Sequence, residues 1–206
     1  IVGFGALTAV MLATAGDEAF LMLSLIPKQA WLIFGACFFI GILGGWLADK
    51  LIKSKVHCKG TCAIKIHKDL LGFDKTKHFF KQHLWEHIIK KHIPKLFIWI
   101  FLTLFLVNLL MQQFDLTKLN QFNKLFLLFF AALLGIIPES GPHLIFLTLF
   151  SKHLIPFSIL LTNSLVQDGH GLLPLLSYSV KDAIKVKIFN VFIGLIVGLI
   201  LFSFGF

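Results

Sequence analysis

The sequence predicts an all-α fold: a polytopic helical membrane protein with broken and re-entrant helices and an internal repeat that we expect to be inverted. The 206 residues are 57% hydrophobic and only 14% charged, whereas a soluble domain carries about 25% charged residues. Apolar stretches close to the length of about 20 residues that crosses a bilayer recur along the chain. This composition excludes a disordered chain, a disulfide scaffold and an ordinary soluble enzyme.

Residues 1–48 predict a broken helix followed by a membrane span. The segment 2–26 is long enough to cross a bilayer, but the polar residues 15–18 interrupt it, and 30–48 is an uninterrupted apolar span. The chain starts at Ile1 in apolar sequence that does not resemble a cleavable signal. We therefore expect an upstream part to be missing and residues 1–48 to be the remainder of a first repeat.

Residues 49–95 predict a Lys- and His-rich cytoplasmic loop. The loop holds twelve Lys against four acids, and loops rich in Lys stay on the cytoplasmic side of a membrane. An interfacial amphipathic helix near 78–92 is the simpler interpretation. The alternative is a peripheral metal site, because His83 and His87 lie at i, i+4 on one helical face. Nucleic acid is not expected as a partner, since membrane spans flank the basic run.

Residues 96–206 predict the second repeat. Its expected elements are a span at 96–111, a re-entrant hairpin at 124–150, a broken helix at 155–179 and a last span at 188–206. The apolar arm before the Pro- and Gly-containing segment 138–142 has the length of a re-entrant segment and is short for a full span. A hairpin region that crosses the membrane completely remains the alternative.

The repeat becomes visible when residues 2–48 are aligned with 155–201 without a gap. Twelve of the 47 aligned positions are identical, and the two polar interruptions coincide, with Gly16 opposite Gly169. If the hairpin is re-entrant, the lysines that follow the second broken helix (Lys181, Lys185 and Lys187) lie in the cytoplasm, as the positive-inside rule requires. The two repeats then have opposite orientations, which is a common plan of secondary transporters.

Three polar clusters inside apolar segments carry the candidate site. A carboxylate in the middle of a bilayer costs about 2.5–3.5 kcal/mol and is therefore seldom without a function. Carboxylates, amides, carbonyls and imidazoles suit a divalent cation such as manganese, and carboxylates and histidines can also exchange protons. The predicted transport residues are Asp17, Glu18, Glu139, Ser140, His143, Asn163, Gln167, Asp168 and His170. The cation would be a substrate, and no permanently bound cofactor is expected.

Structural interpretations of the same acids remain open. Asp17 and Glu18 could cap a helix over residues 19–25 without binding any ligand. Glu139 could lie at the membrane surface if the helix before it crosses completely. Asp168 and His170 could pair with each other as buried structural groups.

Three motifs resemble one known family. Ala-Thr-Ala-Gly-Asp-Glu-Ala-Phe at 13–20, Ile-Pro-Glu-Ser-Gly-Pro-His-Leu at 137–144 and Asn-Ser-Leu-Val-Gln-Asp-Gly-His-Gly-Leu-Leu-Pro-Leu-Leu at 163–176 are similar to those of the ten-transmembrane heavy-metal exporter family. Members of this family are often labelled manganese transporters and are distantly similar to arsenic efflux permeases. The resemblance implies a bacterial or archaeal inner-membrane protein that moves metal out of the cytoplasm.

The chain departs from this family in one respect. Members carry an earlier Pro-Gly-Cys-Gly-type motif, the first-half partner of residues 138–142, and this sequence does not contain it. The departure agrees with an N-terminally truncated chain. A cysteine ligand from such an upstream part would leave softer metals open as substrates.

The leading hypothesis is a secondary exporter of a divalent cation, coupled to protons and embedded in a lipid bilayer. No nucleotide-binding loop is present, so ATP is not its expected direct energy source. The second hypothesis is a permease for an arsenic or other metalloid species, attracted to broken-helix N-termini. The third is an intramembrane metalloenzyme. The symmetric placement of the polar interruptions favours transport over enzymatic activity.

Overall fold

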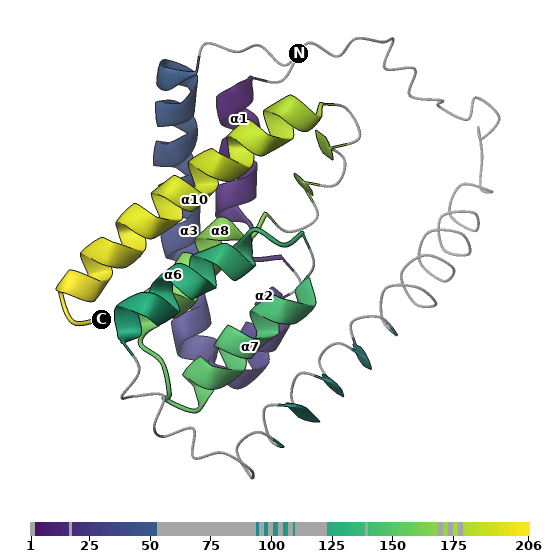
Figure 1. The fold of residues 1–206 in the computed structure, drawn as a ribbon, viewed down its shortest axis with the longest axis vertical. Coiled ribbons are helices and arrows are strands. Elements are labelled where there is room, and N and C mark those ends of the chain that lie inside the picture. Colours follow the sequence, from purple (N-terminus) through teal and green to yellow (C-terminus); the bar gives the residue numbers. More distant parts are fainter. Residues whose placement is uncertain are drawn as a thin grey trace, which may run out of the picture.

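The computed structural model describes residues 3–16, 18–52, 123–138, 140–168 and 179–206, with scattered positions between 94 and 109 and between 171 and 176. It confirms the all-α, polytopic architecture (Figure 1). The helices are α1 (Phe4–Ala13), α2 (Glu18–Leu25), α3 (Pro27–Leu51), α6 (Lys124–Gly135), α7 (Ser140–Ser151), α8 (Phe157–Val166) and α10 (Val180–Ser203). Most of the predicted loop at 49–95, including His83 and His87, and most of the predicted span at 96–111 lie outside the described residues, whereas positions 49–51 belong to α3.

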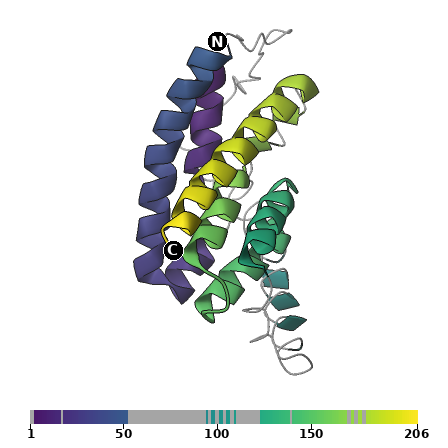
Figure 2. The ribbon, with the colours of Figure 1, turned by 60° about the vertical axis from the view of Figure 1, so that its left-hand side comes forward.

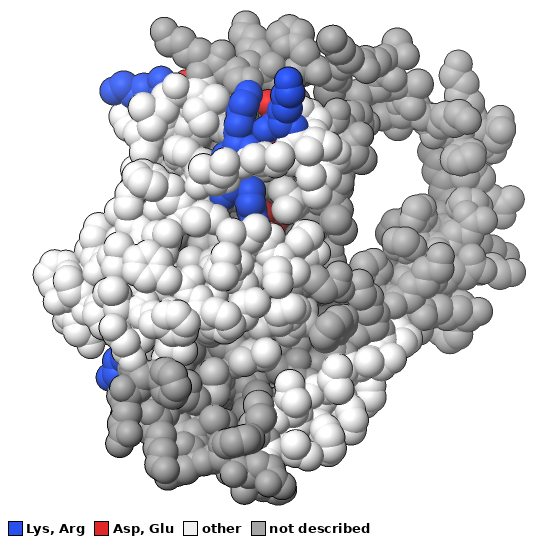
Figure 3. Space-filling view, viewed as in Figure 1, with Lys and Arg blue, Asp and Glu red and all other residues white. Residues whose placement is uncertain are grey.

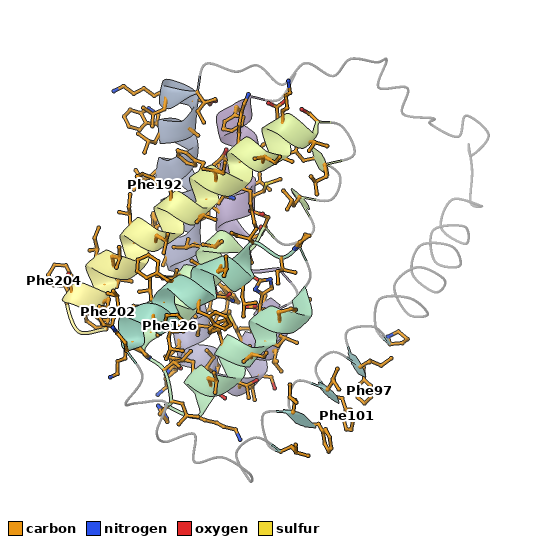
Figure 4. The ribbon with its side chains drawn as sticks, in the orientation of Figure 1. Phe97, Phe101, Phe126, Phe192, Phe202 and Phe204 are labelled. Atoms are coloured by element: carbon orange, nitrogen blue, oxygen red, sulfur yellow. The ribbon has the colours of Figure 1, made fainter. Side chains whose placement is uncertain are left out.

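Three described segments are long and apolar enough to cross a membrane: Phe4–Leu25, Pro27–Leu51 and Val180–Ser203. The last has 24 residues, which as a helix measure about 36 Å and exceed the bilayer core of about 30 Å. Figure 3 shows uncharged side chains over most of the described surface on that face, with lysines near its upper end. Phe126, Phe192 and Phe204, labelled in Figure 4, are exposed by 61%, 61% and 73%. These side chains suit contact with lipid.

Small residues let α1 and α3 pack closely in an antiparallel pair. A Cβ atom added at Gly45 would lie 2.6 Å from the Ala9 Cβ and 2.7 Å from the Gly5 carbonyl oxygen. One added at Gly41 would lie 2.9 Å from the Ala9 carbonyl oxygen. Small side chains at such contacts are typical of helices that associate in membranes, where close van der Waals packing replaces the hydrophobic effect. At the end of the pair, Asp49 Oδ1 accepts a hydrogen bond of 2.6 Å from the Gly5 amide.

The pair α8 and α10 repeats this packing at the aligned positions. Gly194 and Gly198, the counterparts of Gly41 and Gly45, lie against Val166 and Thr162 of α8, where added Cβ atoms would overlap their side chains. The helix bounds repeat as well: α1 and α8 align from first to last residue, and α3 and α10 begin at aligned residues. The sequence repeat therefore corresponds to a repeated structural unit, a short helix followed by a break and a long antiparallel helix.

The two long helices run in opposite directions. In Figures 1 and 2, α3 rises towards the upper end of the molecule, whereas α10 starts near that end and descends to the C-terminus. Because α1 is antiparallel to α3 and α8 is antiparallel to α10, the two short helices also point in opposite directions. Their C-terminal ends approach each other in the interior.

Helices α6 and α7 occupy the segment that we predicted as a re-entrant hairpin. Each has 12 residues, which measure about 18 Å and are too short to cross a bilayer core. Asn123 caps α6 by accepting a hydrogen bond of 3.1 Å from the Leu125 amide. A turn at 136–138 ends α6, and the hairpin packs against α8 and α2. These short arms agree with a re-entrant hairpin, which stays a prediction.

Helix α10 begins at Val180, before the predicted start of the last span at 188, because Ser179 caps it. The Ser179 hydroxyl accepts from the Asp182 amide at 3.3 Å and donates to Asp182 Oδ2 at 2.9 Å. We expect Ser179→Ala to lower the free energy of unfolding by about 1 kcal/mol, the usual value of an N-cap. Thermal unfolding in detergent, with Ser203→Ala at the other end of the helix as the control, measures this; equal stability of both variants would show that the cap is unimportant.

Candidate functional site

Two helix breaks form the centre of the candidate site. Helix α1 ends at Ala13, Gly16 adopts a positive φ of 59°, and α2 begins at Glu18. A left-handed backbone favours glycine, which has no Cβ to clash. Helix α8 ends at Val166, and Gln167 and Asp168 continue outside the helix. Each break leaves backbone carbonyls without helical partners, and such carbonyls can bind a cation or a polar side chain.

Hydrogen bonds join the two breaks directly. The Gln167 amide Nε2 donates to the Ala15 carbonyl oxygen at 2.8 Å. The Asn163 amide Nδ2 lies 3.5 Å from Glu18 Oε1, a long contact. All three side chains are buried. The structure therefore brings together Glu18, Asn163 and Gln167, which the sequence placed in clusters more than 140 positions apart.

His143 extends this network from α7. Its Nδ1 lies 3.1 Å from Asn163 Oδ1, and its Nε2 lies 3.1 Å from the Ile137 carbonyl oxygen. The Ile137 carbonyl can only accept, so Nε2 must donate the hydrogen bond. The network is then satisfied when His143 and Glu18 share one proton, in either of two states. In the first, the imidazole is charged and its Nδ1 donates to Asn163 Oδ1, while Asn163 Nδ2 donates to the Glu18 carboxylate. In the second, the Asn163 amide is reversed, its nitrogen donates to Nδ1 of a neutral imidazole, and a protonated Glu18 donates to its oxygen. His143, Asn163 and Glu18 thus form a polar chain across three helices.

Asp168 is held by a second buried group of residues. Its Oδ2 lies 2.5 Å from the Lys187 ammonium, and its Oδ1 accepts from Asn190 Nδ2 at 2.7 Å. Lys187 also donates to the carbonyl oxygens of Gly135 at 2.7 Å and Val166 at 2.9 Å. These two carbonyls belong to the last residues of α6 and α8. Lys187 therefore connects two helix ends with the acid.

Lys187 and Asn190 are the site residues that the sequence analysis missed. The prediction that Lys187 precedes the last helix together with Lys181 and Lys185 is wrong, because Lys187 lies within α10, is only 7% exposed and is bonded in the interior. The error follows from starting the last span after Lys187, whereas the helix begins two turns earlier. The spacing of Lys187 and Asn190 at i, i+3 within one helix was the available signal.

The described residues account for part of the predicted site. Asp17, Glu139 and His170 lie outside them, as does the side chain of Ser140, whose backbone starts α7. Within the described ranges, no group of three or more His, Cys, Asp and Glu side chains is placed to hold a metal. The alternative pairing of Asp168 with His170 is therefore untested, but Lys187 and Asn190 are partners of Asp168. Glu18 lies in the first turn of α2, as the capping interpretation expected.

One family model matches this chain, over residues 1–123 and 95–204. This model describes the family "Putative, 10TM heavy-metal exporter". No curated protein and no solved structure matches the chain. The two matched ranges together cover nearly all of the sequence, including both helix breaks and the hairpin. The chain is a multi-pass membrane protein that belongs to this heavy-metal exporter family.

Proposed function

We propose that this protein is a secondary transporter that exports a divalent metal cation, with manganese as the first candidate, in exchange for protons. The main support is that the broken helices α1 and α8 meet in the interior, where Gln167 bonds to Ala15 and the carboxylate of Glu18 lies beside them. Family membership supports metal export in general terms. The broken helices and buried carboxylates support a transport pathway rather than an enzyme active site.

The electrostatics of the two breaks favour a cation. A helix C-terminus carries about half a negative elementary charge, and the end of α1 contributes one at this break, whereas the last carbonyl of α8 is bonded to the Lys187 ammonium. Glu18 adds a carboxylate there, 3.5 Å from the Asn163 amide nitrogen. In transporters, half-helix C-termini and unwound carbonyls are the groups that coordinate cations. Hard oxygen donors suit manganese better than soft metals.

The arrangement of the repeats supports alternating access. The units α1–α3 and α8–α10 share their packing but run in opposite directions, as an inverted repeat requires. Inverted repeats transport by rocking one unit against the other around a central site. We therefore propose that the two units exchange inward-facing and outward-facing conformations about the helix breaks. The hairpin of α6 and α7 would enter from one side as a re-entrant element.

Protons are the proposed counter-ion because the polar chain of His143, Asn163 and Glu18 is satisfied by one shared proton. A divalent cation at Glu18 would compete with that proton, so binding of the metal would release it. Exchange of metal for protons follows when Glu18 binds the metal and releases its proton on one side of the membrane, and releases the metal and takes up a proton on the other.

The test uses the full-length protein in sealed proteoliposomes, with manganese entry and proton movement recorded by separate dyes. We expect manganese-driven proton flux in the wild type and at least about a tenfold loss in Glu18→Gln, which removes the buried charge. Asp182→Asn is the matched control, because this acid lies at the start of α10 and pairs with Lys185 on the surface.

The other outcomes are equally informative. Wild-type rates in Glu18→Gln would exclude Glu18 from the pathway. Flux of arsenic species without manganese flux, in vesicles shown to be tight, would replace the proposal with metalloid export. A chemical product without net flux would indicate a metalloenzyme.

A further inference from the structure

The buried ammonium of Lys187 lies among oxygen atoms in the way that a bound metal ion would. We name the Gly135 carbonyl oxygen, the Val166 carbonyl oxygen and Asp168 Oδ2 the oxygen cluster; they lie 2.7, 2.9 and 2.5 Å from the Lys187 Nζ. Carboxylate and carbonyl oxygens are the preferred ligands of hard divalent cations, which bind them at about 2.0–2.6 Å. Shifts of a few tenths of an ångström would adapt the cluster to such an ion.

The charge of the oxygen cluster suits a divalent ion better than a lysine. Asp168 contributes one negative charge, and the C-termini of α6 and α8, which end at Gly135 and Val166, contribute about half a charge each. The total of about two negative charges is only half balanced by one ammonium. A divalent cation would balance it fully.

A buried amide side chain, that of Asn190, adjoins the oxygen cluster. Asn190 is fully buried and holds Asp168 Oδ1 through its amide nitrogen, which directs its own Oδ1 elsewhere. The structure gives Asn190 Oδ1 no hydrogen-bond partner among the described residues. A buried amide oxygen left without a partner costs free energy, about 1–3 kcal/mol in typical cases. A cation in the cluster would offer this oxygen a partner if the amide turned, at the expense of the hydrogen bond from Asn190 Nδ2 to Asp168 Oδ1.

We infer that the Lys187 ammonium is a tethered substitute for the transported cation: a divalent metal ion enters the oxygen cluster by displacing it. This inference rests on the proposed export function and assigns Lys187 a regulatory role in it. When no metal is bound, the ammonium neutralises Asp168 and ties α6, α8 and α10 together. When metal arrives, the ammonium leaves and the metal connects α6 with α8 and Asp168, while α10 stays linked to Asp168 through Asn190.

The aligned positions of the first repeat explain why only one such cluster exists within the described units. In the repeat alignment, Asp168, Lys187 and Asn190 correspond to Ala15, Phe34 and Cys37. The first unit therefore offers neither an acid nor a tethered cation at these positions. The second unit would bind the ion, and the first would provide the opposing surface with Glu18.

The first experiment measures cation binding by thermal unfolding of the detergent-solubilised full-length protein, without any transport assay. In Lys187→Leu the ammonium is lost but the oxygen cluster is kept, so manganese is expected to stabilise it at concentrations at least about tenfold lower than the wild type requires. Lys185→Leu, an exposed lysine on the same helix, should respond like the wild type. The double variant Asp168→Asn/Lys187→Leu should lose the response. A manganese response of Lys187→Leu no stronger than that of the wild type would overturn the inference.

A second experiment uses the wild type and so does not depend on the folding of a variant. Reductive methylation of lysines with formaldehyde is followed by peptide mass spectrometry, with and without manganese. Displacement of the ammonium predicts that manganese increases methylation of Lys187 at least about threefold and leaves Lys185 unchanged. Equal or reduced methylation of Lys187 would contradict displacement. Both experiments report manganese binding at the oxygen cluster and not transport. The export proposal is tested separately, and absence of manganese transport by the wild type would contradict it.

Discussion

Asp168→Asn is expected to destabilise the protein by about 3–5 kcal/mol and to abolish metal transport. The substitution removes the only charged partner that the described residues provide for Lys187, which remains buried with its positive charge uncompensated. Breaking a buried ion pair by removing one partner has this cost because the remaining charge is still desolvated. Thermal unfolding in detergent and manganese flux in proteoliposomes measure the two effects.

The double variant separates the charge pair from the fold. In Asp168→Asn/Lys187→Leu no buried charge remains unbalanced, and replacing a buried ion pair by neutral groups is often nearly neutral for stability. We therefore expect the double variant to recover most of the stability that Asp168→Asn loses, while transport stays absent. A double variant as unstable as the sum of the two single ones would show that the two residues do not act as a pair.

Gly45→Val is expected to lower the free energy of unfolding by about 1–3 kcal/mol or more, the range seen for overpacked cores. A Cβ at Gly45 would lie 2.6 Å from the Ala9 Cβ and 2.7 Å from the Gly5 carbonyl oxygen. The carbonyl is backbone and cannot move aside as a flexible side chain could. The helices α1 and α3 would have to separate, which would also move the break that follows α1.

Gly35→Val is the matched control for this prediction. Gly35 lies on the same helix, and a Cβ added there meets nothing within 4 Å. Both substitutions change helix propensity equally, so a difference between them isolates the contact with α1. Gly198→Val, at the aligned position of the second unit, should behave like Gly45→Val, because its Cβ would overlap Thr162. Similar unfolding temperatures for Gly35→Val and Gly45→Val would refute the close packing of the pair.

The sequence by itself determined the membrane class, the approximate place of most described helices and the repeated pattern. Apolar length predicted α3, and the polar interruptions at Gly16 and Gly169 predicted where the flanking helices would break, because glycine and polar residues weaken a helix locally. The repeat alignment predicted that the two interruptions coincide, and α1 and α8 have matching bounds in the structure. These features depend on properties of neighbouring residues, which a sequence displays directly.

Only the tertiary structure decided which polar residues meet. Asn163 of α8 contacts His143 of α7, the preceding helix. Asp168, which follows α8, pairs with Lys187 of α10. By sequence alone, Lys187 resembled its exposed neighbours Lys181 and Lys185, since a positive charge beside an apolar span normally marks the membrane surface. The cap at Ser179 and the packing of α10 against α8 carry Lys187 inward, and its burial becomes tolerable because Asp168 and two helix-end carbonyls surround the ammonium.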